Sequence, residues 1–171
     1  MKTFSKDSET EKIELLMDSE GLDENFIKSV GRLTLNFAHL EFCFALFTGS
    51  QLGTRQPLNQ IIIAELSFKQ LLNISSGIYK AIETDKENLA KFDQILKDAF
   101  SLEERRNTIT HSFYGHNKEA KIIVRHKNTS KGKNGYREQA EIINAESVNE
   151  IADQMSKTSI ELGKMIFNLS K

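Results

Sequence analysis

The sequence is poor in the residues that mark secreted, disulfide-rich or low-complexity chains. Its 171 residues include one cysteine, one proline and no tryptophan, with a formal net charge of only −1. A single cysteine excludes a fold held by disulfides within the chain, and so little proline excludes collagen-like sequences. The most apolar stretch, from Phe37 to Phe47, is about half as long as a membrane-spanning helix. The N-terminal segment also lacks a signal-peptide pattern, so we expect a cytoplasmic protein that does not enter the membrane.

Apolar residues recur at intervals of three and four along most of the chain, which is the spacing of one buried helix face. Residues 1–20 show this pattern weakly and predict at most a short helix. Stronger stripes predict four long helices, from Asp23 to Phe47, from Pro57 to Thr84, from Asp85 to Phe113 or Gly115, and from Glu146 to Leu169. Gly49 and Gly53 are expected to end the first of them, because glycine suits helix C-termini.

A shorter, alternating pattern interrupts the helices between about residues 118 and 143. Residues 121–125 and 136–143 read as strands, and the segment between them is rich in the turn-forming residues Asn and Gly. The expected fold is therefore all-α: a bundle of about four to five helices with a small β-hairpin inserted before the last helix. No linker or internal repeat divides the chain, so we expect a single domain over residues 1–171.

The near-zero net charge hides a strong asymmetry. Between His116 and Arg137 there are seven cations and one anion, a net charge of +6, so the other residues sum to −7. A basic hairpin beside an acidic body is typical of proteins that contact phosphate backbones, although lysines also protect exposed strand edges. Only Tyr136 is aromatic in the hairpin, so we expect contact with phosphates rather than with bases. The candidate RNA-binding residues are Lys121, Arg125, Lys127, Lys131, Lys133 and Arg137.

A second feature, the segment Arg106-Asn107-Thr-Ile-Thr-His111, lies late in the third long helix. At about 100° per residue, Arg106 falls in the middle of the apolar face, and Asn107 and His111 replace apolar residues beside it. Burying an unpaired guanidinium is expensive, so Arg106 either reaches past the helix end, pairs with a glutamate, or belongs to a functional site. We find no metal-binding, nucleotide-binding or serine-nucleophile motif.

This segment resembles the signature of the HEPN superfamily, in which an arginine followed by a polar residue precedes a histidine by a few positions, late in a helix of an all-α bundle. The looser spacing also occurs from Arg105 to His111 and from Arg32 to His39. Only Arg106 is followed by Asn, and the pair Arg32 and His39 lies in the most apolar helix, where we expect a structural role.

The resemblance implies a metal-independent endoribonuclease of the toxin–antitoxin or antiviral-defence type, which acts as a homodimer without a cofactor and has an antitoxin or a defence-system protein as a possible partner. Histidine can move protons near neutral pH, so His111 would be the general acid or base. Arg106 would stabilise the phosphate, and Asn107 would orient the imidazole or the phosphate. On an ideal helix Arg106 and His111 point about 140° apart, so we expect two copies to complete one site. The alternative is a non-catalytic HEPN-like dimer that binds RNA, a nucleotide or a partner protein.

Overall fold

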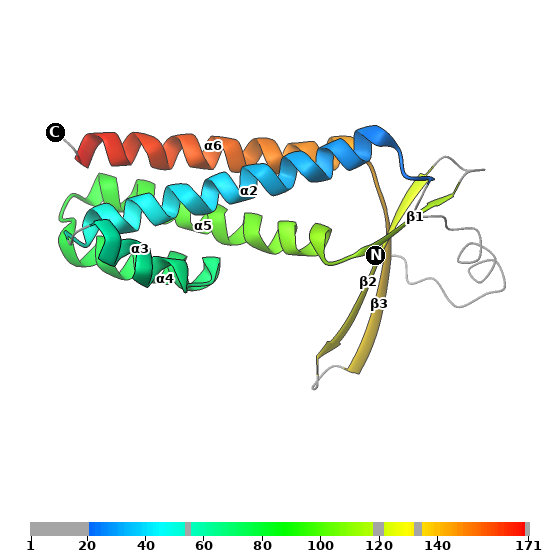
Figure 1. The fold of residues 1–171 in the computed structure, drawn as a ribbon, viewed down its shortest axis with the longest axis horizontal. Coiled ribbons are helices and arrows are strands. Elements are labelled where there is room, and N and C mark those ends of the chain that lie inside the picture. The colour runs from blue at the N-terminus through cyan, green and yellow to red at the C-terminus, as the bar shows by residue number, and fades with distance from the viewer. Residues whose placement is uncertain (1–20, 54–55, 118–121, 132–134, 170–171) are drawn as a thin grey trace. The chain divides into compact units, whose positions relative to one another are not determined.

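The computed structural model describes residues 21–53, 56–117, 122–131 and 135–169. Within these ranges the chain is mostly helical, with a three-stranded antiparallel sheet before the last helix, which confirms the predicted fold class (Figure 1). The elements are α2 (Glu24–Gln51), α3 (Gln56–Ala64), α4 (Phe68–Ile82), α5 (Lys86–Thr110), β1 (Phe113–Asn117), β2 (Ile122–Lys131), β3 (Gly135–Ile143) and α6 (Ala145–Leu169). The short helix predicted within residues 1–20 lies outside the described residues.

The described residues pack into two compact units that share helices α2, α5 and α6. The first, which we call the sheet unit, runs up to Gly31 and from Thr108 to Asn149. The second, which we call the helical unit, comprises residues 32–107 and the chain from Glu150 onward. Each unit is described by itself below.

The helical unit is built around aromatic side chains from α2, α4 and α5. Phe47, Tyr79 and Phe92 contact one another with ring centroids 4.5–5.3 Å apart, and all three are almost completely buried. Phe68 packs edge-on against Phe37 and Phe44 of α2. Such contacts add to the stabilisation that comes from burying large apolar surfaces. These rings therefore fix α2 against α4 and α5, the helix that contains Arg106.

The predicted helix from Pro57 to Thr84 is wrong in one respect, because the structure divides it into α3 and α4. Ser67 begins α4 with a capping box: its hydroxyl accepts a hydrogen bond from the backbone N–H of Gln70, whose side chain accepts one from the Ser67 N–H. This pairing satisfies N–H groups that a helix start otherwise leaves without partners. Gly53, just beyond α2, has a φ of +61°, which confirms its expected role after a helix end, whereas Gly49 lies within α2.

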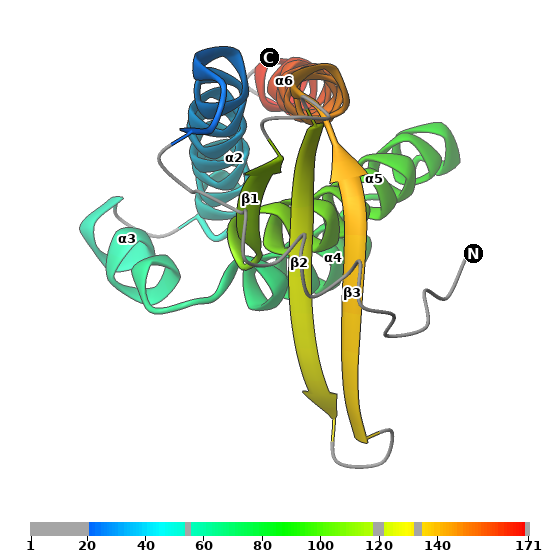
Figure 2. The ribbon, with the colours of Figure 1, turned by 90° about the vertical axis from the view of Figure 1, so that its right-hand side faces the viewer.

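The sheet has the order β1-β2-β3, and both pairings are antiparallel (Figure 2). Strands β2 and β3 are longer than the predicted strands. They remain paired with each other beyond His126, the last residue of β2 that pairs with β1. Phe113 pairs with His126, which in turn pairs with Ala140, whereas the next row joins Tyr114, Arg125 and Glu141. Because neighbouring residues of a strand face opposite ways, these two rows belong to different faces.

The two faces of the sheet have different environments. The inner face contains Tyr114, whose ring lies 5.1 Å from that of Phe26, and the buried pair Ile123 and Ile143. Among the described residues, the outer face contains two exposed large apolar side chains, Phe113 and Ile142. The sheet therefore buries one face within its unit and exposes apolar side chains on the other.

Strand β1 was not predicted from the sequence, which indicated that the preceding helix runs to Phe113 or Gly115. Helix α5 ends at Thr110 instead, and Phe113–Asn117 pairs along its whole length with β2. Sheet pairing supplies the backbone partners that a longer helix would have supplied, and the Tyr114 hydroxyl donates a hydrogen bond to the carbonyl of Ile109 in the last turn of α5. This end of α5 places His111 outside the helix.

Candidate functional site

Arg106 lies on the side of α5 that packs against α2. Its guanidinium carbon is 4.3 Å from the centre of the Phe37 ring, and the side chain is half-buried. A cation over an aromatic face is attracted by the negative charge density of the ring. Arg106, which was predicted to fall on the apolar face of its helix, therefore lies against Phe37, an aromatic side chain in the core of the helical unit.

Asn107 also contacts this guanidinium. An Arg106 Nη1–H donates a hydrogen bond to Oδ1 of Asn107 over 2.8 Å. The amide therefore orients the arginine in this structure, whereas the sequence suggested that it would orient the imidazole or the phosphate. A guanidinium held by a ring and an amide loses little further freedom when it binds an anion.

The two consecutive arginines have different surroundings. Arg105 donates a hydrogen bond over 2.5 Å to the Gln154 side chain of α6, whereas Arg106 lies against Phe37 of α2. A helical rotation of about 100° separates neighbouring positions, which explains why they reach different helices. Of the two, Arg106 is the one held by the asparagine of the sequence motif.

His111 belongs to the sheet unit and is exposed in the turn after α5. The Ser112 hydroxyl beside it donates a hydrogen bond to the carbonyl of Thr108 and accepts one from Arg125. Because the helix ends before His111, the angle of about 140° predicted on an ideal helix does not apply. The exposed imidazole is accessible to a ligand.

Glu103 and its surroundings were not predicted from the sequence as part of the site. It lies three residues before Arg106 on α5, so both residues occupy the same side of the helix. Burial raises the pKa of the Glu103 carboxyl, Lys69 and Arg106 act to lower it, and Glu41 acts to raise it. Charges on α2, α4 and α5 therefore act on Glu103. The spacing of three residues between Glu103 and Arg106 was the sequence signal that could have indicated this.

The candidate RNA-binding residues of the hairpin do not share one environment. Arg125 is only 4% exposed, and its guanidinium donates hydrogen bonds to Ser112 and Glu141. Lys127 is half-buried, and its Nζ donates to the Thr108 hydroxyl over 3.3 Å. Arg125 is thus engaged inside the sheet unit, and Lys127 is the candidate whose ammonium lies near the end of α5.

The other candidates are placed only by backbone register or not at all. Residues 131 and 137 fall at register positions on the same side of the strand pair as Lys127, because residue 131 lies four positions along β2 and residue 137 pairs with Thr129. Lys121 and Lys133 lie outside the described residues. Strand β3 also adds Glu138 and Glu141, opposite Asn128 and Arg125, just beyond the basic segment.

Arg32 and His39, the second match to the loose arginine–histidine spacing, both lie on α2 and contact different residues. Arg32 forms an ion pair with Asp153 of α6. The imidazole Nε2 of His39 lies 3.7 Å from Sγ of Cys43, and burial raises the pKa of this thiol, as for a core cysteine. These contacts agree with the structural role expected for Arg32 and leave Cys43 without features of a reactive thiol.

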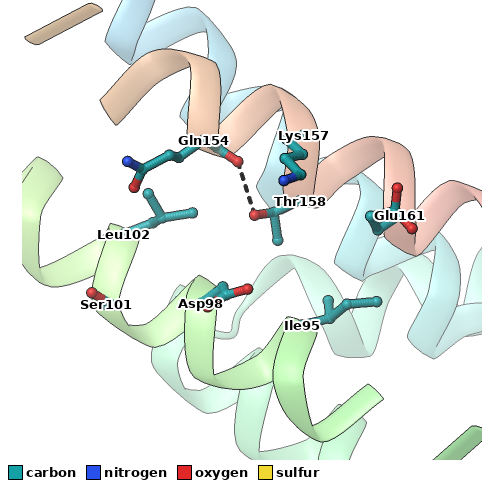
Figure 3. Close-up of a pocket in the computed structure, with 8 residues that line it drawn as sticks. All are labelled: Ile95, Asp98, Ser101, Leu102, Gln154, Lys157, Thr158 and Glu161. Atoms are coloured by element: carbon teal, nitrogen blue, oxygen red, sulfur yellow. Dashed lines mark hydrogen bonds between the residues drawn. The ribbon is translucent and has the colours of Figure 1, made fainter. Parts of the chain in front are cut away.

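A cavity of about 240 Å³ lies within the helical unit between α5 and α6 (Figure 3). Asp98 and Glu161 contribute carboxylates to its lining, which already accept hydrogen bonds from Gln94 and Lys164. The Thr158 hydroxyl donates to a backbone carbonyl of its own helix. The cavity therefore offers mixed charges without a nucleophile paired with a base.

Within the described ranges, no cluster of three or more His, Cys, Asp or Glu side chains could hold a metal ion, and no helix has the length and apolarity to cross a bilayer. We found no protein-family model, curated protein or solved structure that matches this chain.

Proposed function

We propose that this protein is a HEPN-like, metal-independent endoribonuclease of the toxin or phage-defence type. The observation that supports it most directly is the state of the motif residues: Asn107 and Phe37 hold the Arg106 guanidinium, and His111 is exposed in the turn that follows the same helix. A fixed cation and an accessible imidazole are the two groups that cleavage of RNA by its own 2′-hydroxyl requires.

Each residue takes one role in the proposed reaction. His111 removes the proton from the 2′-hydroxyl or protonates the 5′-oxygen that leaves, since imidazole serves either purpose near neutral pH, and water makes the other proton transfer. The 2′-oxygen attacks phosphorus, and the P–O bond to the 5′-oxygen breaks, which gives a 2′,3′-cyclic phosphate. Arg106 stabilises the negative charge on the phosphoryl oxygens during this exchange.

The hairpin supplies attraction for the RNA backbone in this proposal. Lys127 belongs to the same unit as His111. Its ammonium donates a hydrogen bond to Thr108, a residue three positions before His111 in the chain. Lys131 and Arg137 continue the basic character along β2 and β3. A strand pair rich in cations draws a polyanion toward the exposed histidine.

A non-catalytic HEPN-like module that binds RNA, a nucleotide or a partner protein is the second candidate. The observation in its favour is that Asn107 already accepts from Arg106 and that Phe37 covers the guanidinium. An arginine used in this way contributes to the core even when no reaction takes place. The first candidate cleaves RNA and needs His111 to do so, whereas the second binds its ligand without cleaving it.

Cleavage of a labelled structured RNA in EDTA tests the proposal. Wild type is expected to give products with 2′,3′-cyclic phosphate ends, and His111→Ala is expected to lose about 10²–10⁴-fold in rate. His39→Ala is the matched control, since His39 is an exposed histidine of the loose second match. Equal cleavage by wild type and His111→Ala, or none by either, contradicts the nuclease proposal.

Mixing two inactive variants tests whether two copies share a site. If Arg106 of one copy acts with His111 of another, Arg106→Ala mixed with His111→Ala regains activity, because the mixed dimer contains one complete pair. If both residues act within one copy, the mixture stays inactive. Sedimentation equilibrium on the same samples gives the oligomeric state.

A further inference from the structure

Within the helical unit, one side of α2 is exposed although its residues are apolar. Leu35, Ala38, Phe42 and Leu46 follow one another at intervals of three and four, so they form one stripe along the helix, which we call the α2 stripe. Leu35 is 72% exposed, Phe42 58% and Leu46 46%, and Ala38 is exposed as well. The buried residues of the helix, such as Phe44, lie about half a turn away. Helix α2 is therefore apolar on a second side that the core of the helical unit does not cover.

Helix α3 packs against α2 at the end of this stripe and adds apolar surface. The Asn59 side-chain amide donates a hydrogen bond over 2.9 Å to the carbonyl of Gly49, which lies three residues after Leu46 on the same side of α2. Three side chains of α3 are each more than half exposed, namely Leu58, Ile61 and Ile62. Together with the large residues of the α2 stripe they expose roughly 700 Å², whereas each partner in a standard protein interface buries ~800 Å². The surface is therefore large enough to form most of one side of a stable interface.

This surface belongs to a part of the chain that is almost without charge. In residues 32–53 and 56–64, Arg32 and Glu41 are the only Lys, Arg, Asp or Glu residues, although the chain as a whole is 27% charged. Arg32 forms an ion pair with Asp153 of α6, and Glu41 is half-buried and acts on the pKa of Glu103. A surface without charge does not select a partner of opposite charge, and two copies can bury it against each other without repulsion or loss of ion hydration. It therefore fits itself, as a two-fold interface requires.

The sizes of the side chains along the α2 stripe indicate how two copies meet. A parallel pair of helices would set Phe42 against Phe42 and leave a gap between two alanines at position 38, whereas packed interfaces avoid both. An antiparallel pair, with its two-fold axis between positions 38 and 42, sets the large Phe42 against the small Ala38 and brings Leu35 close to Leu46. We propose that α2 packs antiparallel against α2 of a second copy of this chain, with Phe42 of each copy against Ala38 of the other. This inference gives the expected homodimer a surface, but it rests on the α2 stripe and not on RNA cleavage.

The molecular mass in solution tests this proposal without an assay of activity. Wild type is expected to give twice the 19.5 kDa of one chain in sedimentation equilibrium. Phe42→Glu removes the central ring from both copies, so it is expected to raise the Kd of the dimer at least about 100-fold, which is about tenfold for each copy. Phe167→Glu is the matched control, because Phe167 on α6 is 77% exposed, and it is expected to keep the Kd within about twofold of wild type.

A mixture of two variants tests the antiparallel arrangement. Ala38→Lys is expected to weaken the dimer as Phe42→Glu does, because it places an ammonium against the Phe42 ring of the other copy. Mixing the two variants is expected to restore dimers, since each mixed pair joins the introduced ammonium to the introduced carboxylate and keeps one Phe42–Ala38 contact. Both positions are exposed on a helix, so the variants are expected to keep the helix content of wild type in circular dichroism.

Four results would overturn the proposal. The first is a wild type that keeps the mass of one chain up to about 100 μM. The second is a Phe42→Glu variant that dimerises like wild type, and the third is a Phe167→Glu variant that weakens the dimer as much as Phe42→Glu does. The fourth is a mixture of Ala38→Lys and Phe42→Glu that stays monomeric.

The outcomes also separate this inference from the nuclease proposal. If the variants change the mass as expected while wild type cleaves no RNA, the α2 interface stands and the nuclease proposal fails. If wild type cleaves RNA while its mass is that of one chain, only the inference about α2 fails.

Discussion

A guanidinium over an aromatic ring has a measurable energy, and Arg106 over Phe37 is such a pair. We expect a double-mutant cycle with Arg106→Met and Phe37→Leu to give a coupling of about 0.5–2 kcal/mol in the free energy of unfolding. The cycle is needed because Phe37 also packs against Phe68, so the single change removes two contacts. Urea denaturation of the four proteins measures the coupling, and additive effects would mean that the ring does not stabilise the cation.

Arg125 illustrates a buried cation with a solvent-exposed partner. Its side chain is 5% exposed, whereas that of Glu141 is 61% exposed. Removing the carboxylate leaves the charge buried, whereas removing the arginine leaves an acid that water can solvate. We therefore expect Glu141→Gln to lower the free energy of unfolding by about 1–3 kcal/mol, and by more than Arg125→Met does.

The control for this pair is Glu24→Gln, which breaks an ion pair between two well-exposed side chains, Glu24 and Lys28. Exposed pairs contribute little, so the expected change in urea denaturation is below about 1 kcal/mol. A larger loss for Arg125→Met than for Glu141→Gln would show that the hydrogen bond to Ser112, rather than the buried charge, dominates.

Glu103 makes the free energy of unfolding depend on pH, and the direction of its pKa shift gives the sign of this dependence. Burial raises the pKa of its carboxyl, so the folded chain binds the proton more tightly than the unfolded chain. The contribution of Glu103 to stability therefore falls as pH rises from the ordinary carboxyl range through the raised pKa. We expect Glu103→Gln to increase stability relative to wild type more at about pH 7 than at about pH 4. Urea midpoints measure this, and Glu104→Gln, at an exposed neighbouring position, is the control.

At the scale of the element, helix α4 contains a glycine that no close contact requires. A Cβ added at Gly77 meets nothing within 4 Å, and the residue is exposed in the middle of the helix. Gly77→Ala is therefore expected to raise the free energy of unfolding by about 0.5–1 kcal/mol. Ser67→Ala, which removes the capping hydroxyl of the same helix, is expected to lower it by about 1 kcal/mol. Opposite signs in thermal denaturation check both.

The elements that the sequence predicted are those whose pattern is local and long. The spacing of apolar residues predicted α2, α5 and α6 because each buries a stripe over many turns. The sequence Ser-Phe-Lys-Gln that starts α4 was readable as a capping box, yet continuous apolar spacing from Pro57 onward masked the break. Strand β1 could not be predicted in this way, because its pairing with β2 joins residues up to 13 positions apart, from Phe113 with His126 to Asn117 with Ile122.

Predicting the candidate site had the same limits. The helical position of Arg106 correctly indicated a cation on the apolar face, and its neighbour Asn107 accepts a hydrogen bond from it. That Asn107 holds the arginine, and that Arg125 is buried against Glu141, depends on side-chain contacts that no spacing encodes. The strand position of Phe113 was missed because a helix end was expected where the chain forms β1.

At the scale of the whole molecule, a net charge of −1 combines a segment of +6 with a remainder of −7. If the segment contacts RNA, binding must depend on which lysines are removed and not only on the net charge. A triple variant, Lys131→Gln, Lys133→Gln and Arg137→Gln, removes three segment cations and leaves Lys127 on its Thr108 contact. For a single strand the slope of log affinity against log salt is expected to shrink by about 2.

The matched control removes the same three charges elsewhere, as Lys28→Gln, Lys80→Gln and Lys164→Gln. These lysines form exposed ion pairs with acids of the helices, so their loss changes the net charge equally without touching the segment. The probe is an uncleavable 2′-O-methyl RNA, and its affinity is measured by fluorescence anisotropy from about 50 to about 500 mM salt. The slope is expected to equal that of wild type in the control and to be less steep only in the segment variant. Equal slopes in all three proteins would mean that the +6 segment does not bind phosphates and that its lysines protect the strand edge instead.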